Sequence, residues 1–204
     1  MTRPSSRTDS GQAILEFAFM MPLICVLALG VAEFGWALLD AHIVTRLARE
    51  GSNLISRDTS LQDASSALQG MSTRPVDFNA VAPNGAKMIL SVIRNVSTIG
   101  AANYNRPVLY QRYEYGPYAG VSKLIISGSG SFGPAPEYQA INSDNNTGLQ
   151  VTNLPGTVGT TLGGMVYVTE IYSPHVLITP LNNFNFPNSW YFTLPTFFYS
   201  IAYF

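Results

Sequence analysis

The sequence predicts an α+β chain, in which a long N-terminal helix, first transmembrane and then amphipathic, precedes an antiparallel β-sheet domain. The run from Phe17 to Leu39 holds a single charged residue, Glu33. As a helix this run is about 35 Å long at about 1.5 Å per residue, which is enough to cross a hydrocarbon core of about 30 Å. After residue 86 the apolar residues are largely β-branched or aromatic and form short runs between turn residues, a pattern typical of strands.

Length and composition limit the classes of protein that fit. A chain of 204 residues has room for one membrane helix and one domain of ordinary size. Charged residues are 11% of the chain and the net charge is −1, so no basic surface indicates nucleic acid as a partner. The single cysteine, Cys25, lies in the apolar run, so no intrachain disulfide can hold the domain.

The first part of the chain is predicted to be helical in three stretches. Residues 1–11 are polar and include Arg3 and Arg7, which favour a short cytoplasmic leader. Residues 12–39 form the transmembrane helix, with Pro22 inside it and Glu33 expected to contact head groups near the far interface. Residues 40–72 hold an amphipathic continuation of that helix and then a short second helix.

The amphipathic continuation is predicted to end near residue 55, because its apolar side chains keep to one face. The second helix is predicted to begin at a capping box formed by Thr59 and Gln62 and to end before Pro75. The apolar face of the continuation is Leu39, Ile43, Leu47, Leu54 and Ile55.

Residues 73–204 are predicted to form an extracytoplasmic β-rich domain. Residues 127–164 are rich in Gly, Ser, Asn and Pro and are interpreted as a long variable loop. Glu170, between Tyr167 and Tyr172, is predicted to face solvent from its strand. The predicted strands are Lys87–Val96, Val108–Tyr115, Val121–Ser127, Met165–Tyr172 and Trp190–Phe204, the last in two pieces either side of Pro195.

Glu16 is the candidate functional residue, because a carboxylate at the start of an apolar run is costly and needs a partner. If the chain were cut after Gly11, Gln12 would carry a new α-amino group one helical turn from Glu16, on the same face. At close contact and an effective dielectric near 20, that attraction is about 4 kcal/mol before desolvation. The alternative is that Glu16 only reaches the head-group layer.

These residues resemble a known family. Gly11, followed by Glu16 as the fifth residue of the cut chain and then by a long apolar helix, is similar to type IV prepilins and pseudopilins. Narrower matches resemble the TadE-like pseudopilins of tight-adherence (Flp) pilus systems. They are Glu16-Phe17-Ala18, Pro22-Leu23, Glu33-Phe34-Gly35 and Ala48-Arg49-Glu50-Gly51. The resemblance covers residues 11 to about 51 and is weak beyond them.

The resemblance implies a function, partners and a location. It implies a minor pilin or pseudopilin, a structural subunit in the assembly or initiation of the pilus, with links to cell adhesion and secretion. A prepilin peptidase would cut between Gly11 and Gln12. The other partners would be pilins and pseudopilins, the inner-membrane assembly platform and membrane lipid. The chain would cross the bacterial inner membrane once, with a cytoplasmic N-terminus and a periplasmic or extracellular domain, and could be incorporated in the pilus. A pilin-like fold is implied as well.

The competing interpretation is a membrane-anchored or secreted binding or adhesion module. It would carry an uncleaved anchor, or an ordinary signal cut after Gly30 or Ala32. Against such a signal, Glu16 would interrupt its apolar region, and hydrophobicity continues through Leu39. No enzymatic activity, metal site or cofactor is predicted, since the histidines, His42 and His175, have no neighbouring metal-ligand types.

Overall fold

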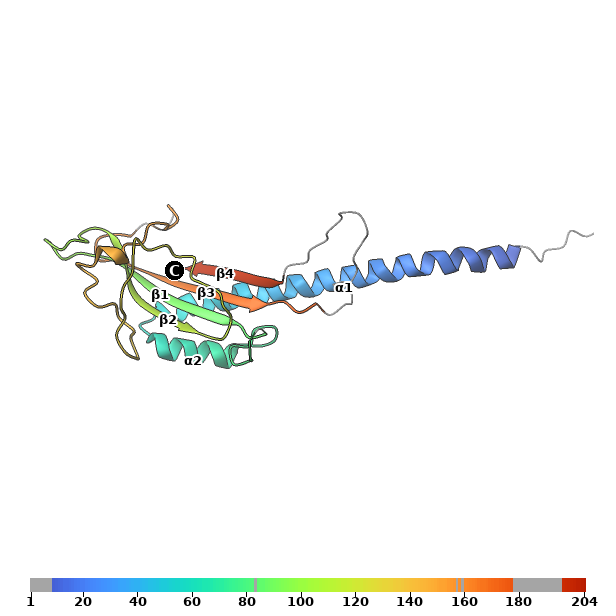
Figure 1. Cartoon of the computed structure of the whole chain (residues 1–204), viewed down its shortest axis with the longest axis horizontal. Coiled ribbons are helices and arrows are strands. Elements are labelled where there is room, and N and C mark those ends of the chain that lie inside the picture. Colours follow the sequence, from blue (N-terminus) through green and yellow to red (C-terminus); the bar gives the residue numbers. More distant parts are fainter. Residues whose placement is uncertain (1–8, 83, 157, 159, 178–195) are drawn as a thin grey trace, which may run out of the picture. The chain divides into compact units, whose positions relative to one another are not determined.

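The computed structural model describes residues 9–82, 84–156, 158, 160–177 and 196–204, with side chains from residue 11 on. The chain divides into two compact units. The first contains the chain up to Leu39, and the second contains Asp40–His175 and Pro195–Phe204. The predicted α+β class is confirmed: a long apolar helix precedes a four-stranded antiparallel sheet (Figure 1).

Helix α1 (Asp9–Ile55) runs through the apolar stretch and ends where its amphipathic pattern ends. It continues through Pro22. Helix α2 (Leu61–Met71) is capped by Ser60, whose Oγ accepts a hydrogen bond from the Asp63 N–H at 3.1 Å. The predicted Thr59–Gln62 capping box was therefore wrong by one residue, because Ser60 and Asp63 have the same three-residue spacing and are closer to the first helical turn.

The sheet has the strand order β2-β1-β3-β4, and every neighbouring pair is antiparallel. Strands β1, β2 and β3 lie where the sequence predicted strands. The second piece of the last predicted strand is β4, and the piece before Pro195 lies outside the described residues. The strands are β1 (Lys87–Asn95), β2 (Pro107–Tyr115), β3 (Met165–Pro174) and β4 (Phe197–Tyr203).

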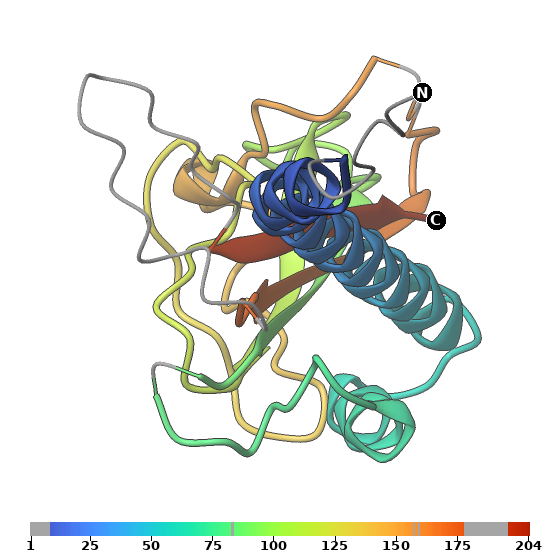
Figure 2. The same ribbon diagram turned by 90° about the vertical axis from the view of Figure 1, so that its right-hand side faces the viewer.

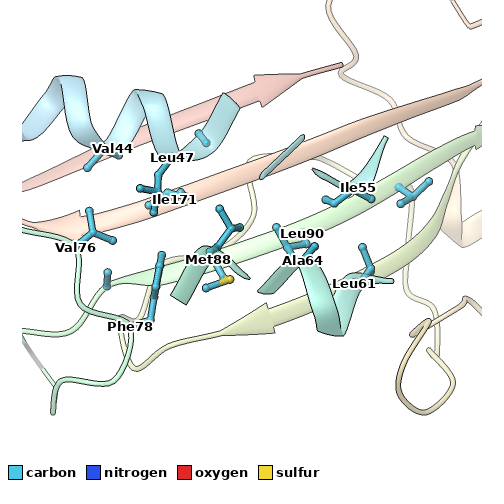
Figure 3. Close-up of a cluster of buried hydrophobic side chains, with 14 residues drawn as sticks. Val44, Leu47, Ile55, Leu61, Ala64, Val76, Phe78, Met88, Leu90 and Ile171 are labelled. Atoms are coloured by element: carbon cyan, nitrogen blue, oxygen red, sulfur yellow. The ribbon is translucent and has the colours of Figure 1, made fainter. Parts of the chain in front are cut away.

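One face of the sheet is covered by helices. In Figure 3, Val44 and Leu47 of α1 lie close to Ile171 of β3, and α2 contributes Leu61 and Ala64 to the same cluster. Figure 2 shows both helices beside the sheet. The amphipathic part of α1 thus packs on the sheet. The buried face of α1 differs from the predicted one, because Leu39 is exposed and small residues take part. The buried residues of this face are Val44, Leu47, Ala48, Gly51, Ser52 and Ile55.

The other face of the sheet is covered by the connection between β2 and β3. Leu124, Leu149 and Val151 of this connection join a second buried cluster with Val168 of β3. Within this connection, the predicted strand Val121–Ser127 was wrong. The segment is irregular and contains one isolated bridge. The described residues of the predicted loop over 127–164 are irregular apart from short bridges and the 3₁₀ turn η1 (Thr147–Leu149), yet they form a packed layer.

Candidate functional site

The start of α1 holds the predicted cleavage and charge-pairing residues. A Cβ added at Gly11 would have no described atom within 4 Å, so packing within the chain does not require glycine there. The Gln12 Nε2 donates a hydrogen bond to Glu16 Oε1 at 3.1 Å, which brings the two residues together on one helix face.

The membrane-length part of α1 presents its apolar side chains outward. Its large apolar residues from Ile14 to Leu29, Phe17 among them, are 40–75% exposed, and Cys25 is exposed as well. Among the described residues, α1 is the single helix long and apolar enough to cross a membrane. Such a surface is stable in lipid or against other apolar helices, not in water. These observations support a single-pass membrane protein.

The Glu33-Phe34-Gly35 motif combines a buried acid with exposed neighbours. The side chains of Glu33 and Ala37, four residues apart on one helix face, are 1% and 8% exposed, whereas Phe34 is 62% exposed. The predicted head-group contact of Glu33 was therefore wrong. The sequence shows the end of the apolar run but not that this face of the helix is covered. A Cβ at Gly35 would have no described atom within 4 Å.

The Ala48-Arg49-Glu50-Gly51 motif divides between two faces of α1. Arg49 and Glu50 are exposed, whereas Ala48 is fully buried. Gly51 lies against β3, where a Cβ would come within 2.7 Å of the Thr169 Cγ2. The next residue, Ser52, donates its hydroxyl to the Ala202 carbonyl of β4 at 2.9 Å. The small residues of the motif therefore let α1 approach the sheet closely.

Asp40 and His175 form a contact that the sequence did not predict. The His175 Nδ1 lies 2.8 Å from an Asp40 carboxylate oxygen, and the His175 side chain is 1% exposed. The backbone N–H of His175 donates to the Thr196 carbonyl at 2.9 Å. This contact joins the start of the Asp40–Ile55 part of α1 to the end of β3 and the beginning of β4. Residues 135 apart in sequence carry no local signal of such a pair.

Glu170 is the buried carboxylate of the domain, and its predicted solvent exposure was wrong because the β2–β3 connection covers this face of the sheet. Its side chain is fully buried and accepts hydrogen bonds from three donors. These are the Ser122 hydroxyl, the Lys123 N–H at 2.7 Å and the Tyr199 hydroxyl at 2.7 Å. Arg112 Nη2 donates to Ser122 Oγ at 2.9 Å, which adds a cation to the cluster. Glu170 thus joins β3 to β4 and to the irregular segment that replaces the predicted strand.

The cluster around Glu170 shifts the ionisation of its neighbours. Burial, and then the charge of Glu170, raises the pKa of Tyr172 to about 12. Burial and the hydrogen bond to Glu170 raise the pKa of Tyr199 further still. Burial lowers the pKa of Arg112, although Glu114 and Glu170 act against that change. The described residues contain no group of three or more His, Cys, Asp or Glu that could hold a metal ion.

The fold and the exposed apolar helix define a class: a membrane protein in which one spanning helix carries an antiparallel sheet domain. Residues 11–53 match the family model described as TadE-like protein. This segment is therefore a TadE-like domain, which confirms the family resemblance and associates the chain with tight-adherence pili. The match covers about a fifth of the chain and includes every motif residue named above. Comparison with curated proteins and with solved structures yielded no match.

Proposed function

We propose that the chain is a minor pilin or pseudopilin, a structural subunit that acts in the assembly or initiation of a tight-adherence pilus. The observation that carries the proposal is the TadE-like match over residues 11–53, which contains both Gly11 and Glu16. The exposed apolar surface of α1 supports it, because this surface suits lipid before assembly and other pilin helices after it. Its partners would be other pilins and pseudopilins, the inner-membrane assembly platform and membrane lipid.

The proposed orientation follows from the leader. Residues 1–11 would lie in the cytoplasm, residues 12–39 would span the inner membrane, and the domain would lie outside the cytoplasm. A reporter that is active only outside the cytoplasm, fused after Phe204, should be active. Activity of a cytoplasmic reporter at the same position would reverse this orientation.

The proposed processing step creates the charge that Glu16 would neutralise. A prepilin peptidase would hydrolyse the peptide bond between Gly11 and Gln12, leaving an α-amino group on Gln12. In the uncut chain the Gln12 side chain already bonds to Glu16, so the two residues share the face on which the new amine would form. The amine and carboxylate could then pair within a helix or between neighbouring helices, which offsets the cost of taking either charge into an apolar bundle.

Two glycine substitutions test the processing step. Neither Gly11 nor Gly30 has a described atom within 4 Å of an added Cβ, so Leu at either position should leave the chain folded. Intact-mass measurement of the membrane-bound protein should show a wild-type product that starts at Gln12. Gly11→Leu should retain the full-length precursor because the branched side chain blocks a peptidase pocket shaped for Gly, and Gly30→Leu should be cut like the wild type.

The same pair of variants distinguishes the pilus subunit from the competing function, a secreted binding module. If Gly30→Leu blocks processing and Gly11→Leu does not, the chain carries an ordinary signal peptide. It would then be a secreted binding module and not a pilus subunit.

A further inference from the structure

The two edges of the sheet differ in whether their backbone groups are already paired. At the β2 edge, the Ala140 N–H donates to the Tyr110 carbonyl at 2.7 Å, and the Val151 N–H donates to the Pro107 carbonyl at 2.9 Å. The β2–β3 connection thus closes this edge. Strand β4 forms the opposite edge, and in the described part of the chain its one strand neighbour is β3.

The register of β3 and β4 shows which backbone groups of β4 point outward. Tyr167 and Phe204 exchange two hydrogen bonds, of 3.0 and 2.9 Å, so they are a hydrogen-bonded pair. Such pairs alternate along an antiparallel ladder, which makes Ala202, Ser200 and Phe198 the other β4 residues bonded to β3. The N–H and C=O groups of Tyr199, Ile201 and Tyr203 therefore face away from the sheet.

Within the described strand β4, three features that natural proteins use to prevent strand pairing are missing: charged residues, proline and a β-bulge. Residues 197–203 contain no charged residue and no proline, and the β3–β4 register is continuous, without a bulge. An edge of this kind is a template for a further strand.

The sequence of β4 identifies a second copy of the same strand as the partner that fits. From Phe198 to Phe204 the chain reads Phe-Tyr-Ser-Ile-Ala-Tyr-Phe, which is the same in both directions except that Ser200 exchanges with Ala202. A two-fold axis through Ile201 would align the outward groups of both copies. It would place Tyr199 opposite Tyr203 of the second copy and small residues opposite small ones.

We propose that two copies of this chain pair through the outer edges of β4, antiparallel and centred on Ile201. The three outward residues of each copy would supply about six backbone hydrogen bonds across the two-fold axis. The result is one continuous sheet of both domains, closed at its outer ends by the β2–β3 connections.

The direction of α1 defines which copies can pair in this way. Along α1, Asp40 contacts His175 and Gly51 contacts Thr169, so this part of α1 runs antiparallel to β3 and parallel to β4. In the symmetric pair the Asp40–Ile55 stretches therefore run in opposite directions. The pair is a contact between copies on two fibres, or on two surfaces that face each other, and not between parallel neighbours in one fibre. This placement rests on the proposed function, whereas the pairing does not.

Register-specific crosslinking tests the pairing in the full chain in detergent. In a Cys25→Ser background, Ser200→Cys and Ala202→Cys chains of different tagged mass are mixed and oxidised. Residue 200 would lie opposite residue 202 of the second copy in a non-hydrogen-bonded pair, with Cα atoms about 4.5 Å apart, within disulfide range. The mixture should form the mixed disulfide and either variant alone should not. Absence of the mixed disulfide, or efficient self-crosslinking of one variant, overturns the proposal.

A matched pair of substitutions tests the backbone bonds. Ile201→Pro removes an outward N–H without removing a bond to β3, and Ile201→Ala loses the same side chain but keeps the N–H. Light scattering should show dimers for the wild type and for Ile201→Ala. For Ile201→Pro, the dissociation constant of the dimer should rise about tenfold or more. A monomeric wild-type chain, or equal weakening by both substitutions, overturns the proposal.

Vesicle clustering tests the placement separately. Phosphatidylethanolamine–phosphatidylglycerol vesicles that display the domain on their outer surface should cluster with the wild-type chain and stay separate with Ile201→Pro. Dimers in detergent without clustering overturn the contact between facing surfaces. Because none of these experiments requires cleavage after Gly11, failure of the pairing and failure of the pilus function give different results.

Discussion

Glu16 and Glu170 both have largely apolar or aromatic sequence neighbours, one in each unit of the chain, yet their environments are opposite. Glu16 lies on an exposed surface of α1 and bonds to Gln12 within the same helix. Glu170 is fully buried and accepts three hydrogen bonds from other parts of the domain. The carboxylate in the domain is therefore satisfied by donors distant in sequence, whereas the carboxylate of the helix stays exposed and bonds to a residue one turn away. It follows that stability of the fold and assembly can be changed separately.

The largest expected effect is the loss of assembly in Glu16→Leu. The substitution makes α1 more apolar and leaves Gly11 in place, so insertion and cleavage should be normal. The new amine of Gln12 would then lack its carboxylate in an apolar bundle. The expected product is a processed, membrane-resident chain absent from pili, and Glu16→Asp should retain part of the function.

Unfolding of the purified chain is the control for this variant. Since Glu16 bonds only locally in the described chain, Glu16→Leu should leave the urea midpoint of the domain unchanged. Wild-type levels of pili with Glu16→Leu would show that Glu16 is a head-group contact, and the pairing mechanism would be wrong.

Glu170→Ala should have the opposite result, with a large loss of stability in the isolated chain. It leaves the partly buried Ser122 and Tyr199 hydroxyls and the Lys123 N–H without their acceptor, close to the Arg112 cation. We expect the free energy of unfolding to fall by about 3 kcal/mol or more, measured by urea unfolding of the full chain in detergent.

Glu114→Ala is the matched control for the buried acid. Glu114 lies on β2 and pairs with Lys87 at 2.7 Å, but its side chain is 40% exposed. Its removal should cost about 1 kcal/mol or less. Equal losses from the two substitutions would contradict the assignment of Glu170 as the acceptor that holds the domain together.

Gly51→Ala tests the contact that joins α1 to the sheet. The added methyl would overlap the Thr169 side chain at 2.7 Å and the Leu68 side chain at 3.1 Å, which should cost about 1–3 kcal/mol of unfolding free energy. Thr169→Ala removes the overlapping atoms and also a buried hydroxyl oxygen that has no hydrogen-bond partner within the described structure. The double variant should therefore recover most of the loss, and failure of this rescue would show that another contact limits the approach.

Patterns that depend on local periodicity were sufficient to predict most of the fold. The apolar run of α1 was predicted because its length and composition suit a membrane-spanning helix. The strand at Lys87–Val96 was predicted because burial on both faces leaves a continuous apolar sequence. Residues Val121–Ser127 have the composition of a strand, but two of their backbone N–H groups donate to side chains and not to a neighbouring strand. Lys123 donates to Glu170, and Ile125 donates to the Asn153 side chain at 2.7 Å. Strand formation requires a neighbour with free backbone groups, which composition does not reveal.

The environment of Glu170 could not be predicted for a related reason. Alternation along β3 assigns Glu170 to one face of the sheet, and a polar residue on such a face normally indicates solvent. The face is instead covered by a Gly- and Asn-rich connection that looks like an exposed loop in the sequence. The pattern at Gly11 and Glu16 could be recognised because its signal is local, and the family match covers both residues, whereas their roles in cleavage and charge pairing stay predictions.

The smallest expected effect is the change in pH dependence caused by Tyr199→Phe. Because the pKa of Tyr199 is raised in the folded chain, the folded state keeps this proton at pH values at which the unfolded chain has lost it. This stabilising contribution is complete below the unfolded pKa of about 10 and is lost as pH rises beyond it. Urea midpoints of the wild type should thus be steady up to about pH 10 and then fall. Tyr199→Phe should lower the free energy of unfolding by about 1–2 kcal/mol near neutral pH and should make the alkaline fall of the urea midpoint less steep. Tyr104 is an exposed loop residue, so the control Tyr104→Phe should have neither effect. An unchanged alkaline slope in Tyr199→Phe would mean that other tyrosines, with Tyr172 the first candidate, carry the pH dependence of this cluster.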